Sequence, residues 1–268
     1  MQNGYDIFLL IGAGIFAGFV NTIAGGGSLL TLPLLIFMGL PPAVANGTNR
    51  IAIAVSSLSA NIGYASKNIK TYPFSIYLGI AAIFGAILGA RIAIEIDGAI
   101  FNRILAIIMI VVVLIMVFKP KMADHISQVR TSGKYLFISL IAFFFIGIYG
   151  GFINAGIGFI IMLFLNIFNK INLVRVNAVK VGVVFIYTIA ALVTFAISGN
   201  VNWLYGLTLA VGTSVGAWTA SRFSVDKGEG FIKLVMIVTV LLMAVKLWLF
   251  NSQHIPQFPN HNLPSQHV

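Results

Sequence analysis

The sequence predicts an all-α integral membrane protein with two homologous repeats, eight long transmembrane helices and two short helices that follow glycine-rich breaks. The chain has 268 residues, of which 59% are hydrophobic and 8% charged, whereas an ordinary soluble domain has about 25% charged residues. Its apolar residues fall into runs of about the 20 residues that a helix needs to cross a bilayer. Related motifs also recur in the same order in the two halves.

The long apolar runs are expected to form eight transmembrane helices. They lie near 5–24, 43–66, 72–94, 100–118, 135–155, 176–198, 202–222 and 231–250. Two shorter runs, 28–40 and 156–168, each follow a glycine cluster and are expected to form short helices. The first run has no basic segment before it and no clear cleavage site after it, so we interpret it as a retained helix rather than a signal peptide.

Polar segments divide the chain into four parts. Residues 1–118 form a first transmembrane repeat, 119–134 a basic connecting loop, 135–250 a second transmembrane repeat and 251–268 a polar tail. Three pairs of motifs recur at nearly the same spacing in the two halves. They are Gly18-Phe19-Val20-Asn21 with Gly151-Phe152-Ile153-Asn154, Ala45-Asn46 with Val176-Asn177, and Gly85-x-x-x-Gly89-Ala90 with Gly212-x-x-x-Gly216-Ala217. Their common order indicates an internal duplication.

The relative orientation of the repeats depends on whether the two short runs cross the membrane. If they only enter and return, the loop cations divide almost evenly between the two sides. If they cross, all the loop cations except Arg91 and Arg103 share one side, namely Lys67, Lys70, Lys119, Lys121, Arg130, Lys134, Lys170, Arg175, Arg222, Lys227 and Lys233. The positive-inside rule favours crossing, which makes the repeats inverted and places both termini outside the cytoplasm, in a multi-pass protein of the inner (cytoplasmic) membrane.

The residue types inside the predicted helices exclude several kinds of chemistry. The chain has no Cys, and its four His residues lie in the central loop and the tail. No interior position of a predicted helix holds a carboxylate or an imidazole, so a Ser-His-Asp triad, an intramembrane metal site and a carboxylate proton relay lack their residues. We therefore expect no enzyme, no cofactor and no metal. The net charge of +10 comes from cations between apolar runs, so no nucleic-acid partner is expected.

The polar groups near the glycine clusters form two candidate half-sites for a small anion. The first consists of Asn21, Gly25, Gly26, Gly27, Ser28, Asn46, Thr48, Asn49 and Arg50, and the second of Asn154, Gly156, Gly158, Asn177 and Lys180. A helix that starts after a break offers unpaired N–H groups and a positive dipole end, which suit an anion. Alternatively, the glycines only permit close helix packing. We favour a site for the two clusters and packing for Gly85, Gly89, Gly212 and Gly216.

Arg50 and Lys180 each follow a repeat-related Asn by about one helical turn. A cation inside a membrane helix is costly unless it faces protein, water or a bound anion. Since no acidic partner lies within the membrane, a substrate anion is a natural counter-ion. The alternative is that both side chains extend to the nearby interface, which is the interpretation that we give to Lys246.

Several segments together resemble one transporter family. They are GAGIFAGFVNTIAGGGSLLTLPLL (12–35), LPPAVANGTNRIAI (40–53), GIYGGFINAGIGFIIMLFL (147–165), VNAVK (176–180) and SGNVNW (198–203). With these segments the chain resembles the sulfite exporter TauE/SafE family of membrane transporters, up to about residue 250. The resemblance implies secondary transport, often export, of sulfite, sulfonates or other small sulfur-containing anions.

We therefore predict a secondary transporter, an exporter or a facilitator, of small sulfur-containing anions across the cytoplasmic membrane. Its expected partners are the anion and the lipid bilayer. An anion channel would use the same anion-binding residues, and turnover kinetics would distinguish it from a transporter. A non-transporting scaffold or assembly subunit is the competing class, and it does not need Asn, Gly and cationic side chains around a shared cavity.

Overall fold

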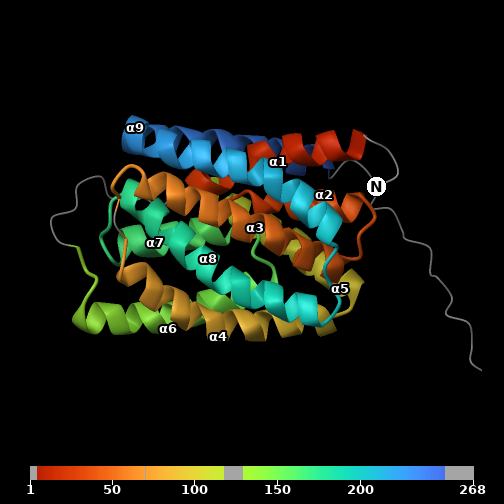
Figure 1. Ribbon diagram of the computed structural model, residues 1–268, viewed down its shortest axis with the longest axis horizontal. Coiled ribbons are helices and arrows are strands. Elements are labelled where there is room, and N and C mark those ends of the chain that lie inside the picture. Colours follow the sequence, from red (N-terminus) through yellow and green to blue (C-terminus); the bar gives the residue numbers. More distant parts are fainter. Residues whose placement is uncertain (1–4, 70, 118–128, 251–268) are drawn as a thin grey trace, which may run out of the picture.

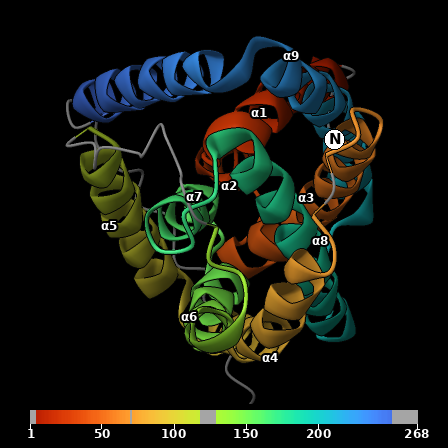
Figure 2. The same cartoon turned by 90° about the vertical axis from the view of Figure 1, so that its left-hand side faces the viewer.

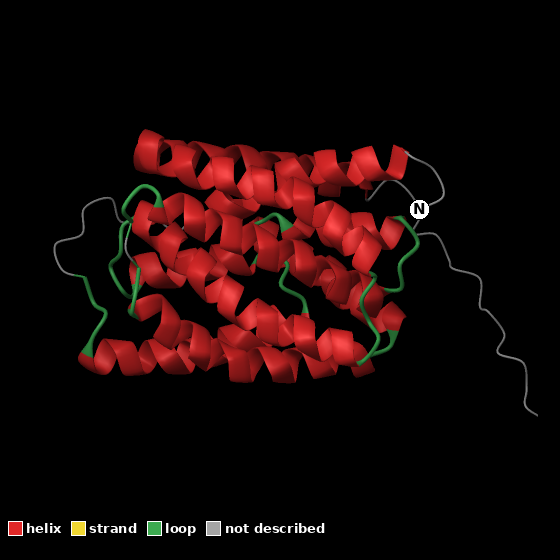
Figure 3. Cartoon of the chain, in the orientation of Figure 1, coloured by secondary structure: helices red, strands yellow, loops and turns green. Residues whose placement is uncertain are grey.

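The computed structural model describes residues 5–69, 71–117 and 129–250, and all regular structure in these ranges is helical (Figure 3). The all-α prediction is therefore confirmed for this part of the chain. The helices are α1 (Tyr5–Ala24), α2 (Ser28–Phe37), α3 (Pro42–Ala65), α4 (Phe74–Glu95), α5 (Gly98–Val117), α6 (Gly133–Phe152), α7 (Ile157–Ile167), α8 (Leu173–Ile197) and α9 (Trp203–Phe250). The short helices α2 and α7 lie where the glycine clusters predict them.

Polar side chains define where two of the helices begin. The Asp97 carboxylate accepts hydrogen bonds from the N–H groups of Ala99 and Ile100 at the start of α5, at 2.9 and 3.1 Å. The Asn172 side chain accepts from the N–H group of Arg175 at the start of α8, at 2.9 Å. These bonds satisfy N–H groups that have no partner within their own helix.

The helices form an elongated bundle in which α1 and α6 run in opposite directions. In Figure 1, α1 begins at the right-hand end, beside the N-terminus, whereas α6 begins at the left-hand end. The end view in Figure 2 places α1 beside α9 on one side of the bundle and α4 beside α6 on the other, with α2 and α7 in the middle. The long helix α3 lies inside this frame and contacts both α8 and α9.

Close approach of backbones explains the repeated spacing of small residues in α4 and α9. A Cβ atom at Gly85 of α4 would lie 2.0 Å from the carbonyl oxygen of Phe144 in α6. A Cβ atom at Gly212 of α9 would lie 2.2 Å from the carbonyl oxygen of Ile11 in α1. The packing interpretation of these glycines is therefore confirmed, as small residues let membrane helices approach closely.

The helix contacts occur in matching pairs when the two halves are exchanged. The contact of α1 with α9 corresponds to that of α6 with α4, and the contact of α3 with α9 corresponds to that of α8 with α4. In each pair, the first or third helix of one half packs on the fourth segment of the other half. The halves are therefore interlocked rather than placed side by side as separate units.

The bundle exposes apolar side chains and buries polar ones. Large apolar residues such as Phe8, Phe84, Phe145 and Ile197 are exposed, whereas many Asn, Ser and Thr side chains are buried. Within the described ranges, four helices are long and apolar enough to cross a membrane, namely Asp6–Ala24, Phe74–Glu95, Gly133–Phe152 and Leu173–Ile197. An outer surface rich in large apolar side chains is typical of a protein that faces lipid.

The expected helices 202–222 and 231–250 are not separate, because both lie in the continuous helix α9. The residues between them include Gly228 and Gly230 but no Pro, so every residue there keeps the backbone N–H that a continuous helix needs. Figure 2 shows the later part of α9 turning toward α5, which it contacts. The tail 251–268, most of the loop 119–134, the four His residues and the Lys246 side chain lie outside the described residues.

Candidate functional site

Two helix breaks lie against each other inside the bundle. Gly25, between α1 and α2, and Gly156, between α6 and α7, have φ angles of 77° and 71°, a conformation that glycine adopts without steric strain. A Cβ atom at Gly25 would lie 2.3 Å from the carbonyl carbon of Gly158, at the start of α7. The backbones of the two breaks are therefore in direct contact, which places the two glycine clusters in one region.

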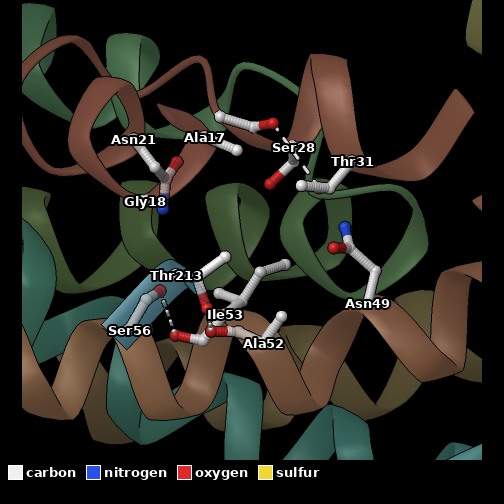
Figure 4. Close-up of a pocket in the computed structure, with 11 residues that line it drawn as sticks. Ala17, Gly18, Asn21, Ser28, Thr31, Asn49, Ala52, Ile53, Ser56 and Thr213 are labelled. Atoms are coloured by element: carbon white, nitrogen blue, oxygen red, sulfur yellow. Dashed lines mark hydrogen bonds between the residues drawn. The ribbon is translucent and has the colours of Figure 1, made fainter. Parts of the chain in front are cut away.

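A small pocket lies beside the first break, between α1, α2, α3 and α9 (Figure 4). Its lining residues are Ala17, Gly18, Asn21, Gly27, Ser28, Thr31, Asn49, Ala52, Ile53, Ser56 and Thr213. The α3 residues of this set follow a helical spacing that brings them to one face. No Asp, Glu, Lys or Arg lines the pocket among the described residues, so its polar groups are all uncharged.

Asn49 is the lining residue whose side chain most directly indicates a ligand. It is 1% exposed, and neither the nitrogen nor the oxygen of its side-chain amide has a hydrogen-bond partner in the described structure. Figure 4 shows this amide directed from α3 toward Thr31 of α2. A buried amide without partners is costly, commonly by about 1–3 kcal/mol for each group. Such a group is explained when a ligand or water occupies the pocket.

The start of α2 contributes further donors to the same pocket. The N–H groups of Gly27 and Ser28, two lining residues, donate to no acceptor in the described part of the chain, whereas the N–H of Leu29 donates to the carbonyl of Gly26. The Ser28 hydroxyl oxygen accepts a hydrogen bond from the Asn154 amide at 3.3 Å, which leaves its own proton free to donate. These groups form a helix N-terminus that suits an anion.

Arg50 follows Asn49 in α3 but binds to the end of α6. Its Nη1 atom donates to the carbonyl of Gly150 at 2.5 Å, and its Nη2 atom donates to the carbonyl of Gly151 at 2.7 Å and to Asn46 Oδ1 at 3.0 Å. The side chain is 0% exposed, so it does not extend to the interface. The guanidinium therefore satisfies carbonyl groups at the C-terminus of a helix from the other half.

Lys180 of α8 makes the reciprocal contact with the end of α1. Its ammonium donates to the carbonyls of Asn21 and Thr22 at 3.1 and 2.7 Å, and to Asn177 Oδ1 at 2.7 Å. It is 2% exposed. Three acceptors match the three protons of a charged ammonium. Lys180 thereby holds the backbone of Asn21, whose side chain lines the pocket.

A protein-family model described as sulfite exporter TauE/SafE matches residues 10–247 of the chain. The chain belongs to this family. A probable membrane transporter protein of Haemophilus influenzae is 30% identical over 248 residues, covering 92% of this chain and 96% of the relative. The probable membrane transporter protein YfcA of Escherichia coli K12 is 31% identical over 244 residues, covering 89% and 90% of the two chains. No solved structure matches the chain.

In this TauE/SafE protein, the predicted site residues fall into two groups. Asn21, Gly27, Ser28 and Asn49 line the pocket. The others form its surroundings: Gly25, Gly26, Gly156 and Gly158 belong to the breaks, Asn154 bonds Ser28, and Asn46, Arg50, Asn177 and Lys180 bind helix-end carbonyls. Thr48 instead accepts a hydrogen bond from the N–H of Asn202 at 2.8 Å, at the start of α9.

Three polar lining residues were missed by the sequence analysis, namely Thr31, Ser56 and Thr213. Ser56 follows Asn49 by two helical turns, so a search of the Asn49 face of α3 could have found it. Thr31 similarly follows Ser28 by one turn of α2. Thr213 is adjacent to the packing glycine Gly212, and no signal in the sequence distinguishes its hydroxyl from the many others in the chain.

In the second half, larger side chains occupy the positions that match two of the lining residues. When α3 and α8 are aligned on the repeat-related Asn46 and Asn177, Lys180 matches Asn49 and Tyr187 matches Ser56. The Tyr187 ring packs so closely that a Cβ atom at Gly150 would lie 3.0 Å from it, and its hydroxyl donates to Asn154 Oδ1 at 2.5 Å. The two halves therefore differ in size and chemistry at these two positions.

Proposed function

We propose that this protein is a secondary transporter or facilitator that moves small sulfur-containing anions, such as sulfite or organosulfonates, across the cytoplasmic membrane. The observation that carries the proposal is the unpartnered Asn49 amide beside the free N–H groups at the start of α2. These donors suit an anion. Transport as the activity is supported by the family match and by relatives that are named as probable membrane transporters.

The proposal includes two inverted repeats, with both termini outside the cytoplasm. Support comes from the opposite directions of α1 and α6 and from helix contacts that correspond when the halves are exchanged (Figure 1). In this topology the short helices count as crossings, and the loop cations gather on the cytoplasmic side. Inverted repeats with a binding site at discontinuous helices are a common transporter design.

The transport step needs no catalytic group in this proposal. The substrate anion enters the pocket, accepts hydrogen bonds from the Asn49 amide and from Ser28, and leaves on the other side without a change in its bonds. A non-transporting scaffold would gain nothing from leaving a buried amide without a partner, since that lowers its stability. The pocket therefore supports transport over the scaffold function.

The test is uptake of radiolabelled sulfite by vesicles that contain the purified full-length chain, with sulfate, thiosulfate, taurine and sulfoacetate as competitors. We expect saturable uptake that falls at least tenfold in Asn49→Ala. The matched control is Asn61→Ala, on the same helix, because Asn61 Nδ2 bonds the Ser57 carbonyl of its own helix at 2.9 Å. Flux that never saturates would indicate a channel, and equal flux in the parent and Asn49→Ala would contradict the site.

A further inference from the structure

The pocket beside the first helix break surrounds its ligand with uncharged donors only. The donors available to an anion include the Asn49 amide, the Ser28 hydroxyl and the N–H groups at the start of α2. We infer that this pocket selects anions that carry one negative charge, so that hydrogensulfite rather than fully ionised sulfite is the transported form. This inference rests on the proposed function, whose site it describes further.

The two buried cations near the pocket are already bound to protein. All three protons of the Lys180 ammonium have acceptors, at the end of α1 and at Asn177. The Arg50 guanidinium makes three hydrogen bonds at the end of α6 and to Asn46. Its Nε atom has no partner in the described structure, but Arg50 is not among the residues that line the pocket. Neither cation is therefore placed to form an ion pair with a ligand in the pocket.

Desolvation favours a singly charged ligand in this pocket. The free-energy cost of removing an ion from water rises with the square of its charge. Hydrogen bonds from neutral amides and hydroxyls offset only part of this cost. A doubly charged anion therefore loses more free energy at these uncharged donors than a singly charged anion does. Asn49 and Ser56, which line the pocket, are neutral, although Lys180 occupies the position matching Asn49 in the second half.

Selection of the singly charged form also links sulfite transport to protons. Hydrogensulfite consists of a sulfite ion and one proton, and it releases that proton when it re-equilibrates on the other side. Each transported ion therefore carries one proton across the membrane. The proton travels on the substrate, so this coupling requires no titrating carboxylate in the bundle.

The test compares methanesulfonate, a small anion with one permanent charge, with sulfate, which has a similar size and two charges. Uptake of each is measured in vesicles that contain the full-length chain, with the membrane potential clamped and protein-free vesicles as the blank. We expect saturable methanesulfonate uptake and sulfate uptake that is at least tenfold slower. We also expect sulfite uptake to rise as the pH falls through the titration of hydrogensulfite, while methanesulfonate uptake stays constant.

Two results would overturn the inference in different ways. If sulfate is transported as fast as methanesulfonate, or if sulfite uptake follows the doubly charged form, charge selection is wrong while the proposed anion transport stands. If neither methanesulfonate, sulfate nor sulfite shows saturable uptake, both the inference and the proposed function fail.

A charge placed at the pocket provides an independent check. Asn49→Lys introduces at this position the residue type that α8 carries at the matching place, and it should raise sulfate uptake relative to methanesulfonate about tenfold, because a nearby cation favours the second negative charge. Asn61→Lys adds the same charge to α3 outside the pocket and should leave the ratio unchanged. An unchanged ratio in folded Asn49→Lys would contradict the inference, and an equal change in both variants would contradict it too.

Discussion

The ammonium of Lys180, on α8, donates a hydrogen bond of 2.7 Å to the carbonyl of Thr22 near the end of α1. Arg50, on α3, donates a bond of the same length to the carbonyl of Gly151 near the end of α6. Each half of the protein thus supplies a buried cation that binds the broken helix of the other half. A cation in this position offsets the negative end of the helix dipole and satisfies carbonyls that lack helical partners.

Replacing Lys180 by Met should destabilise the folded protein. Met fills a similar volume but removes the hydrogen bonds to the carbonyls of Asn21 and Thr22, of which the Asn21 carbonyl keeps its bond from the Gly25 N–H. Hydrogen bonds to charged groups contribute about 1.5–3 kcal/mol each. We expect a clearly lower melting temperature in detergent and reduced anion uptake per folded molecule, since Asn21 lines the pocket. An unchanged melting temperature would show that these contacts contribute little to stability.

Asn49→Asp should abolish anion uptake while the protein still folds. The substitution keeps the shape of the side chain but places a negative charge beside the site where the anion binds, and it removes the amide donor. Uptake in vesicles should fall at least a hundredfold, and the elution profile in detergent should remain that of the parent. Asn61→Asp is the control, because Asn61 lies outside the pocket lining. Similar losses in both variants would contradict a specific role of Asn49.

Gly27→Ala should impair transport through the shape of the pocket. Gly27 has an ordinary helical φ of −58°, so alanine introduces no backbone strain there. Its methyl group would lie 2.3 Å from the carbonyl oxygen of Ala17 and 2.5 Å from Asn21 Cβ, which forces the pocket wall to move. The control is Gly12→Ala, where a Cβ atom meets no other atom within 4 Å. Normal uptake by Gly27→Ala would show that the wall adapts without loss.

Tyr187→Phe should lower stability more than it lowers transport. The change removes the hydroxyl that donates to Asn154 Oδ1, and a buried acceptor left without a partner costs about 1–3 kcal/mol. The phenyl ring still fills the space that matches the pocket in the second half. Thermal unfolding in detergent should therefore shift downward while the Michaelis constant for uptake stays within about twofold. A large rise of that constant would place Tyr187 in the binding site.

Cysteine labelling should place the two ends of the bundle on opposite sides of the membrane. The chain has no Cys of its own, so single cysteines report one position each. We expect Lys134→Cys and Lys227→Cys to react with an impermeant reagent only from the cytoplasmic side, and Arg91→Cys only from the other side. Lys67 pairs with Asp226 at 2.6 Å, which places the α3–α4 loop beside the middle of α9. Labelling of Lys134→Cys and Arg91→Cys from one side would contradict the inverted topology.

Local features of the sequence determined much of the fold. The apolar runs determined an all-α membrane protein, because backbone groups in a bilayer must be satisfied within helices. The glycine clusters determined where α1 and α6 are interrupted, since consecutive or left-handed glycines do not continue a helix. The spacing of Gly85 and Gly212 similarly predicted close helix packing. Composition alone did not show that α9 continues through the polar stretch after Arg222.

The tertiary structure decided which polar groups form the pocket and which support it. Arg50 and Asn49 are adjacent in the sequence, but neighbouring residues of a helix point in different directions. Arg50 therefore binds the end of α6, while Asn49 lines the pocket. The contribution of Thr213 depends on α9 packing against α1 and α3. The sequence identifies the donor side chains, but long-range packing determines which acceptors a buried donor meets. Only the tertiary contacts therefore show that the Lys180 ammonium is hydrogen-bonded to protein, whereas the Asn49 amide has no partner in the described structure.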